Sequence, residues 1–85
     1  SPFESNQKII NSICSDIKKY APSFNVTYEA LSDKKFVIRI SNIKSKEYSL
    51  FLSGYLEALF KKIQKKIMKV EEDSEENKKI IIKFL

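Results

Sequence analysis

The stretch FNVTYEALSDKKFVIRI, residues 24–40, decides the fold of this chain. Apolar Val26 and Tyr28 alternate with polar residues, and Phe36, Ile38 and Ile40 resume the alternation after a polar SDKK segment. A period of two places alternate side chains on one face of a strand. The stretch therefore predicts two antiparallel strands joined by a turn, with one face of the hairpin buried.

Upstream of the hairpin, residues 1–20 predict a helix. Ser1, Pro2 and Glu4 have the spacing of a helix start with a capping box, and Pro22 ends the helix near Tyr20. The apolar residues recur at helical spacing: Ile9, Ile10, Ile13, Cys14, Ile17 and Tyr20. Since Cys14 belongs to this stripe, we expect it to be a buried structural cysteine.

Downstream, a second helix is predicted to run to about Lys66, with Ser45 or Ser49 as its N-cap. Its apolar side comprises Leu52, Leu56, Leu59, Phe60, Ile63 and Ile67. Residues 67–72 also alternate, so a strand is an alternative for them. After an acidic turn, residues 80–85 predict a last strand rich in β-branched residues. That strand is continuously apolar, so either both sheet faces are covered there or it pairs with another copy or domain.

These elements predict a single α+β domain over residues 1–85, which we expect can be a piece of a longer protein. The order is α-β-β-α-(β)-β, where the bracketed strand is residues 67–72. Two helices packed on one face of an antiparallel sheet would bury both helical stripes.

Composition excludes several chemistries. The chain of 85 residues has no histidine and one cysteine, so it lacks the commonest general base, the usual heme and zinc ligands, and a cysteine pair for zinc. No glycine-rich phosphate loop is present. We therefore expect no enzyme activity, cofactor or metal. A single cysteine favours a reducing, cytoplasmic compartment, and no apolar run reaches the roughly 18 residues that a membrane span needs.

The segment FLSGYLE contains the only glycine of the chain. A glycine inside a helix costs about 1 kcal/mol relative to alanine. Either the helix packs closely on its neighbours there, or the missing side chain admits a ligand or a partner. On the second interpretation Phe51, Leu52, Gly54 and Tyr55 form a ligand- or partner-binding site or a dimer surface.

The end of the same helix is rich in lysine. At about 100° per residue, a lysine arc of roughly 140° is predicted on the side opposite the apolar one: Lys61, Lys62, Lys65, Lys66 and Lys69. These residues are candidates for contacts with nucleic-acid phosphates. The alternative is a solvated face that keeps a small domain soluble, and the acidic residues at 71–76 would oppose nucleic acid.

Four segments together carry a resemblance to a known group: APSFNVTYEAL, KKFVIRIS, FLSGYLEALFKKI and KVEEDSEENKKIIIKFL. Over residues 21–85 the chain resembles the C-terminal half of the heme-nitric oxide/oxygen-binding (H-NOX) and 4-vinyl reductase group, whose superfamily includes subunits of the Golgi TRAPP tethering complex. The resemblance implies small-ligand sensing or assembly, with an apolar pocket between helix and sheet. Heme does not carry over, since there is no histidine, and Arg39 and Ser41 do not match the Tyr-x-Ser-x-Arg propionate clamp.

A helix, a hairpin, the helix LSGYLEALFKKIQKKI and a final strand are also similar to the type II KH-like fold of ribosome-binding factor A, although the GxxG loop of KH domains is missing. Two functions follow. The first is a non-catalytic sensory or protein-interaction module in signalling or assembly, whose partner is another protein or domain, a second copy, or a small apolar ligand. The alternative is an RNA- or ribosome-associated factor that uses the lysine arc.

Overall fold

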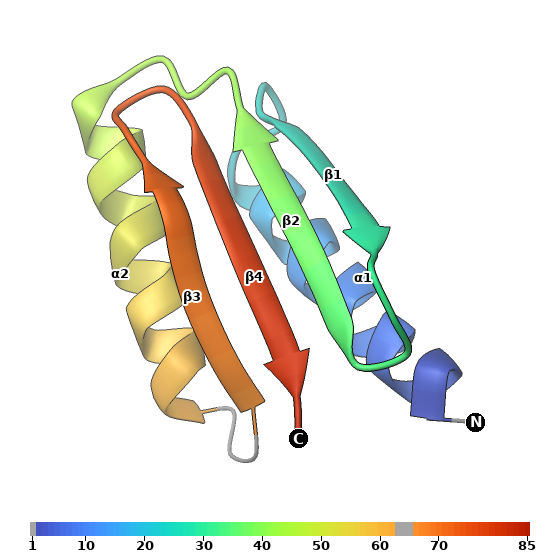
Figure 1. The fold of residues 1–85 in the computed structure, drawn as a ribbon. Coiled ribbons are helices and arrows are strands. Elements are labelled where there is room, and N and C mark those ends of the chain that lie inside the picture. Colours follow the sequence, from blue (N-terminus) through green and yellow to red (C-terminus); the bar gives the residue numbers. More distant parts are fainter. Residues whose placement is uncertain (1, 63–65) are drawn as a thin grey trace.

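The computed structural model describes residues 2–62 and 66–85. The elements are α1 (Pro2–Tyr20), β1 (Asn25–Ala30), β2 (Lys35–Ser41), α2 (Lys46–Lys62), β3 (Lys66–Asp73) and β4 (Lys78–Phe84) (Figure 1). The predicted α+β class and element order are confirmed, and the bracketed strand exists as β3. The predicted cap at Ser1 lies outside the described residues.

The four strands form one antiparallel sheet in the order β1-β2-β4-β3. Because β2 and β3 both run antiparallel to β4, they are parallel to each other, and β2, α2 and β3 form a split β-α-β unit around β4. The apolar run of the last strand is thereby explained within the chain. Ile80 and Ile82 are buried on the helix side and Ile81 is half-buried on the other face, while both edges of β4 are paired.

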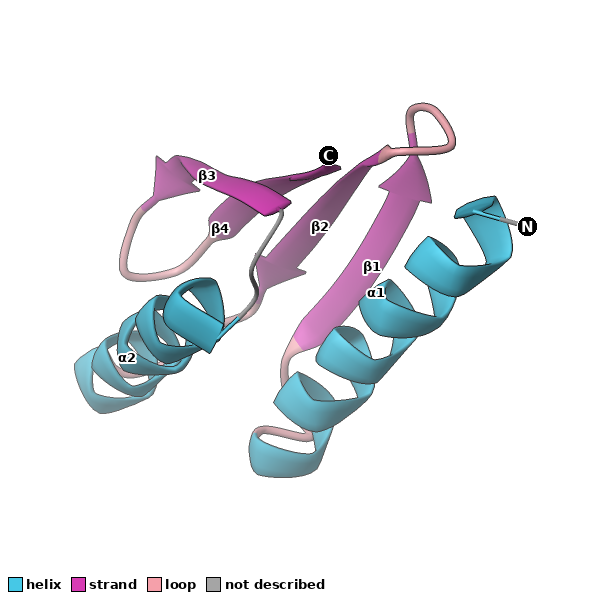
Figure 2. Cartoon of the chain, turned by 90° about the horizontal axis from the view of Figure 1, so that it is seen from below, coloured by secondary structure: helices cyan, strands magenta, loops and turns pink. Residues whose placement is uncertain are grey.

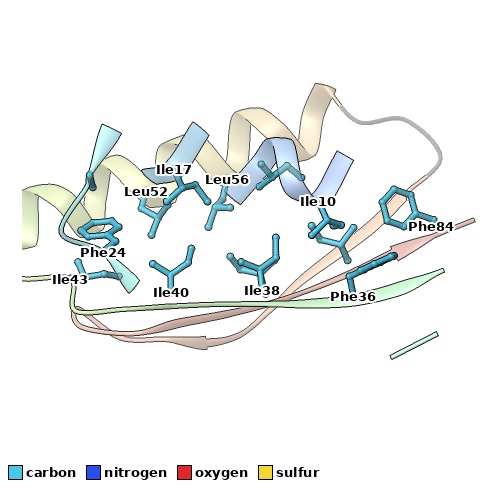
Figure 3. Close-up of a cluster of buried hydrophobic side chains, with 14 residues drawn as sticks. Ile10, Ile17, Phe24, Phe36, Ile38, Ile40, Ile43, Leu52, Leu56 and Phe84 are labelled. Atoms are coloured by element: carbon cyan, nitrogen blue, oxygen red, sulfur yellow. The ribbon is translucent and has the colours of Figure 1, made fainter. Parts of the chain in front are cut away.

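Both helices lie on the same side of the sheet (Figure 2). Phe36, Ile38 and Ile40 of β2 point toward them (Figure 3), as the alternation of the hairpin predicts. The described side chains of this core come from α1, β2, α2, β4 and the connecting segments: Ile10, Ile13, Ile17, Ala21, Phe24, Phe36, Ile38, Ile40, Ile43, Leu52, Leu56, Ile80, Ile82 and Phe84. Within residues 2–62 and 66–85, no helix has the length and apolarity to cross a membrane.

The second helix is shorter than predicted. It ends at Lys62, and Lys66, Ile67 and Lys69 belong to β3, whose residues pair with β4 along most of its length. Pairing with β4 satisfies the backbone of this segment and overrides its helical periodicity. The prediction of one helical lysine arc is therefore wrong, while Ile63 and Lys65 lie outside the described residues.

Candidate functional site: an aromatic groove where the helices meet

The end of α1 and the start of α2 come together through two aromatic rings. The ring centroids of Tyr20 and Phe51 lie 4.8 Å apart, with the ring planes inclined by 42°. Such a tilted pair is a favourable aromatic geometry. It joins the last residue of α1 to the second turn of α2.

Two connecting segments hold these helix ends in place. After β2, Asn42 adopts a left-handed backbone conformation with φ of 64°, which asparagine tolerates better than most residues. Its side-chain Nδ2 donates a hydrogen bond of 2.9 Å to the carbonyl oxygen of Ser23, in the α1–β1 connection. Ser45 then caps α2, since its Oγ accepts a 3.2 Å hydrogen bond from the backbone N–H of Tyr48. The predicted cap at Ser45 is confirmed.

A groove of about 270 Å³ lies at this junction, lined by Tyr20, Glu47, Tyr48 and Phe51. The exposed fractions of the three aromatic residues are 66% for Tyr20, 46% for Tyr48 and 42% for Phe51. The ring of Tyr48 packs edge-on against the buried ring of Phe24, with 5.7 Å between the two centroids. This contact fixes the position of Tyr48 in the groove. We call these four lining residues the aromatic groove.

The candidate residues around Gly54 separate in the structure. Phe51 lines the groove, but Leu52 is only 1% exposed, belongs to the core and does not line the groove. Successive residues of a helix point about 100° apart, which places Leu52 toward the sheet when Phe51 faces the groove. Gly54 is exposed, and nothing lies within 4 Å of a Cβ added there. The close-packing interpretation of Gly54 is therefore wrong.

Tyr55 is half-buried beside the groove and packs against the core. Burial raises the pKa of its hydroxyl, and the nearby Asp16 carboxylate of α1 raises it further. Cys14 is also half-buried rather than fully buried, and burial raises the pKa of its thiol to about 11. At neutral pH both groups are protonated, which makes Cys14 a poor nucleophile.

The lysines predicted as one arc divide between two elements. Lys61 and Lys62 are exposed in the last turn of α2, where Lys61 Nζ lies 3.6 Å from Glu57 Oε1. Lys69 is exposed on β3, and Lys66 is the first residue of that strand. These lysines therefore do not form a continuous helical stripe.

Tyr20, Glu47 and Tyr48 are the groove residues that sequence reasoning missed. A signal was present for Tyr48, since Tyr48, Phe51 and Tyr55 recur at the i, i+3, i+7 spacing of one helix face. Tyr20 could not be assigned in this way, because its proximity to Phe51 depends on how the two helices are arranged on the sheet.

A larger polar hollow of about 630 Å³ lies near the same end, between the β2–α2 connection and the β3–β4 turn. Lys44 and Lys46 line this hollow together with Glu75 and Glu76. Side chains of both signs share this hollow, so it favours no class of charged ligand.

Among the described residues, no group of three His, Cys, Asp or Glu side chains is placed to hold a metal ion. Comparison of the chain with protein families, with curated proteins and with solved structures finds no match. The resemblances to the H-NOX and KH-like groups therefore stay predictions.

Proposed function

We propose that this domain is a non-catalytic protein-interaction module, of the kind used in signalling or assembly, and that its aromatic groove holds an apolar side chain of a partner. The observation that carries the proposal is the joint exposure of Tyr20, Tyr48 and Phe51 around one groove. Tyrosine and phenylalanine are enriched in protein interfaces, where they combine large contact area with few rotatable bonds.

The size of the groove favours a side chain over a larger ligand. Its volume of about 270 Å³ falls below the roughly 300–1,000 Å³ of small-molecule and cofactor sites. Burying one Leu, Ile or Phe side chain contributes about 1.5–3 kcal/mol. A stable complex needs roughly 800 Å² of contact surface on each partner, so the groove would act as the anchor of a wider interface.

The groove also lacks the arrangement that covalent or acid–base catalysis requires. Its ionisable groups are the Glu47 carboxylate and the hydroxyls of Tyr20 and Tyr48. Within residues 2–62 and 66–85, none of these shows a hydrogen bond or ion pair to a second group of the kind that links a nucleophile to its base. The groove does offer exposed aromatic surface, and this surface suits a role in recognition.

A matched pair of substitutions on α2 tests the proposal. Phe51 and Phe60 are both exposed phenylalanines, at 42% and 49%, and nine positions of helix place them on opposite sides. We would select peptides that bind the unmodified domain from a random library and measure their affinity for Phe51→Ser and Phe60→Ser. The expected result is at least a tenfold loss of affinity for Phe51→Ser, which is about 1.4 kcal/mol, and little change for Phe60→Ser.

Thermal melting of both variants provides the control, since a partly exposed side chain should be removable without unfolding the domain. Peptides that bind Phe51→Ser and the unmodified domain equally well would rule out the groove as the recognition site. Sedimentation velocity over a range of concentrations tests the second-copy form of the hypothesis. A dimer that dissociates in Phe51→Ser but persists in Phe60→Ser would identify the partner as another copy of the chain.

A further inference from the structure

The sheet face turned away from the helices carries a group of lysines brought together by strand register. Figure 1 looks onto this face, and Figure 2 shows that both helices lie on the other one. Lys35 of β2 pairs directly with Lys83 of β4, and Lys69 of β3 pairs with Ile81, two residues from Lys83. All three lysines are exposed. We call Lys35, Lys69 and Lys83 the sheet lysines.

These lysines are close neighbours. Directly opposed residues of antiparallel strands have Cβ atoms about 4.5–5.5 Å apart, and diagonal neighbours lie about 7–8 Å apart. The like charges of Lys35 and Lys83 therefore repel each other, which is unfavourable for the free domain. A local arrangement that opposes stability is a candidate for function.

The acidic side chains described on the same face are paired with other cations. Glu29 Oε1 is 3.4 Å from Arg39 Nη1, and Glu71 Oε2 is 3.2 Å from Lys79 Nζ. Both of these carboxylates are therefore engaged by cations other than the sheet lysines. Within the part of the chain that the structure describes, the sheet lysines have no acidic side chain as an ion-pair partner.

Among the side chains that the structure describes, the centre of this face offers little exposed apolar surface. Val37 lies between Lys35 and Arg39 on this face of β2 but is only 2% exposed, although no helix covers it. Its cover must come from neighbouring side chains such as Lys35, Arg39 and Ile81, whose aliphatic parts can lie along the sheet while the charged ends stay in water. A protein partner would find little apolar area for an interface core here, whereas nucleic-acid interfaces are more polar and strongly basic.

We propose that the sheet lysines bind the phosphate backbone of a nucleic acid. Each lysine ammonium is a point charge suited to a phosphate oxygen. The face carries no aromatic residue among its described positions, so bases cannot stack on it as they do on single-strand-binding platforms. Binding therefore depends on phosphate charge and not on base sequence. This surface lies on the other side of the sheet from the helices that form the aromatic groove.

Two triple variants of equal charge test this proposal. The first is Lys35→Gln, Lys69→Gln, Lys83→Gln, and the matched control is Lys8→Gln, Lys18→Gln, Lys19→Gln, which removes exposed lysines of α1. Binding of fluorescent single-stranded RNA of several sequences would be followed by anisotropy as salt is raised. Three phosphate contacts predict a slope of about −2 in log affinity against log salt, and hence about a 15-fold loss from roughly 50 to 200 mM salt.

The sheet variant should lose most of this binding, whereas the control variant and Phe51→Ser should retain it. Equal losses in both triple variants would show that only net charge matters and would overturn the proposal, as would RNA binding that survives in the sheet variant or is absent from the unmodified domain. Polyglutamate provides a third arm, because stronger binding of polyglutamate than of RNA would identify an acidic protein as the partner instead. The single variant Lys83→Gln, expected to lower the slope by about 0.7, keeps the test decisive if the triple variant fails to fold.

Discussion

Position 54 offers a direct measurement of helix stability. Gly54 lies in the middle of α2, is exposed, and leaves open space where a Cβ would stand. Gly54→Ala should therefore raise the free energy of unfolding by up to about 1 kcal/mol, because alanine loses less backbone freedom on folding. Urea denaturation should show a higher midpoint with an unchanged slope. A lower midpoint would mean that the glycine is needed for packing after all.

Titration of the Cys14 thiol measures how far this side chain is buried. In the folded domain the pKa of the Cys14 thiol is about 11, against 9.0 for the exposed group, because burial disfavours the thiolate. The stabilisation from keeping this thiol protonated is complete below pH 9 and is lost as the pH rises toward 11. Thiolate absorbance in the far ultraviolet should titrate near pH 11 in the native protein and near pH 9 in denaturant. Matching midpoints in the two conditions would contradict the half-buried position of Cys14.

The first turn of α2 depends on its cap. Ser45 Oγ accepts from the Tyr48 N–H, and Tyr48 lines the aromatic groove. Ser45→Ala should lower the free energy of unfolding by about 0.5–2 kcal/mol and loosen the groove with it. The matched control is Ser53→Ala, an exposed serine in the same helix, which should leave the denaturation midpoint the same or slightly higher. An equal effect of both substitutions would show that the Ser45 cap does not contribute to the free energy of unfolding.

The hairpin and both helices could be predicted from periodicity, but the boundary between α2 and β3 could not. Ile67 fits the helical spacing of the apolar side of α2, yet residues 67–72 also alternate, so local pattern does not decide between the two. What decides is pairing with β4, whose residues come later in the sequence. The burial of Leu52, by contrast, agrees with the apolar side that local periodicity predicts for α2.

At the scale of the whole molecule, neither candidate surface could be predicted from the sequence, because each combines residues of several elements. Exposure of Phe51 follows from its angle on one helix, whereas the groove needs Tyr20 from the other helix, 31 positions earlier in the chain. The sheet lysines come from three strands, and only their register makes them neighbours. Of these, Lys69 alone was singled out from the sequence, and then as part of a helix. Patterns within an element are readable locally, but sites made by several elements require the topology.

The chain as a unit is not expected to bind heme as H-NOX proteins do. It has no histidine to serve as the proximal ligand, and the space between helices and sheet is filled by the apolar core (Figure 3). Hemin titration should give only a broad, non-saturating Soret absorbance, equal to that with an unrelated basic domain of similar size. A sharp band that saturates at one heme per chain would show this expectation to be wrong.

The position of β4 in the interior of the sheet has a consequence for how the domain is made. β2 and β3 each hydrogen-bond to β4 but not to each other, so a chain being synthesised cannot join its two halves until residues 78–84 have left the ribosome. Before that moment the β1–β2 hairpin and the α2–β3 segment each present an unpaired strand edge, the kind of surface on which chains aggregate. Because β2 and β4 are distant in sequence, closing the sheet depends on non-local contacts that form slowly. Folding should therefore occur in one late cooperative step, and the interval before β4 emerges is when the nascent chain most needs protection.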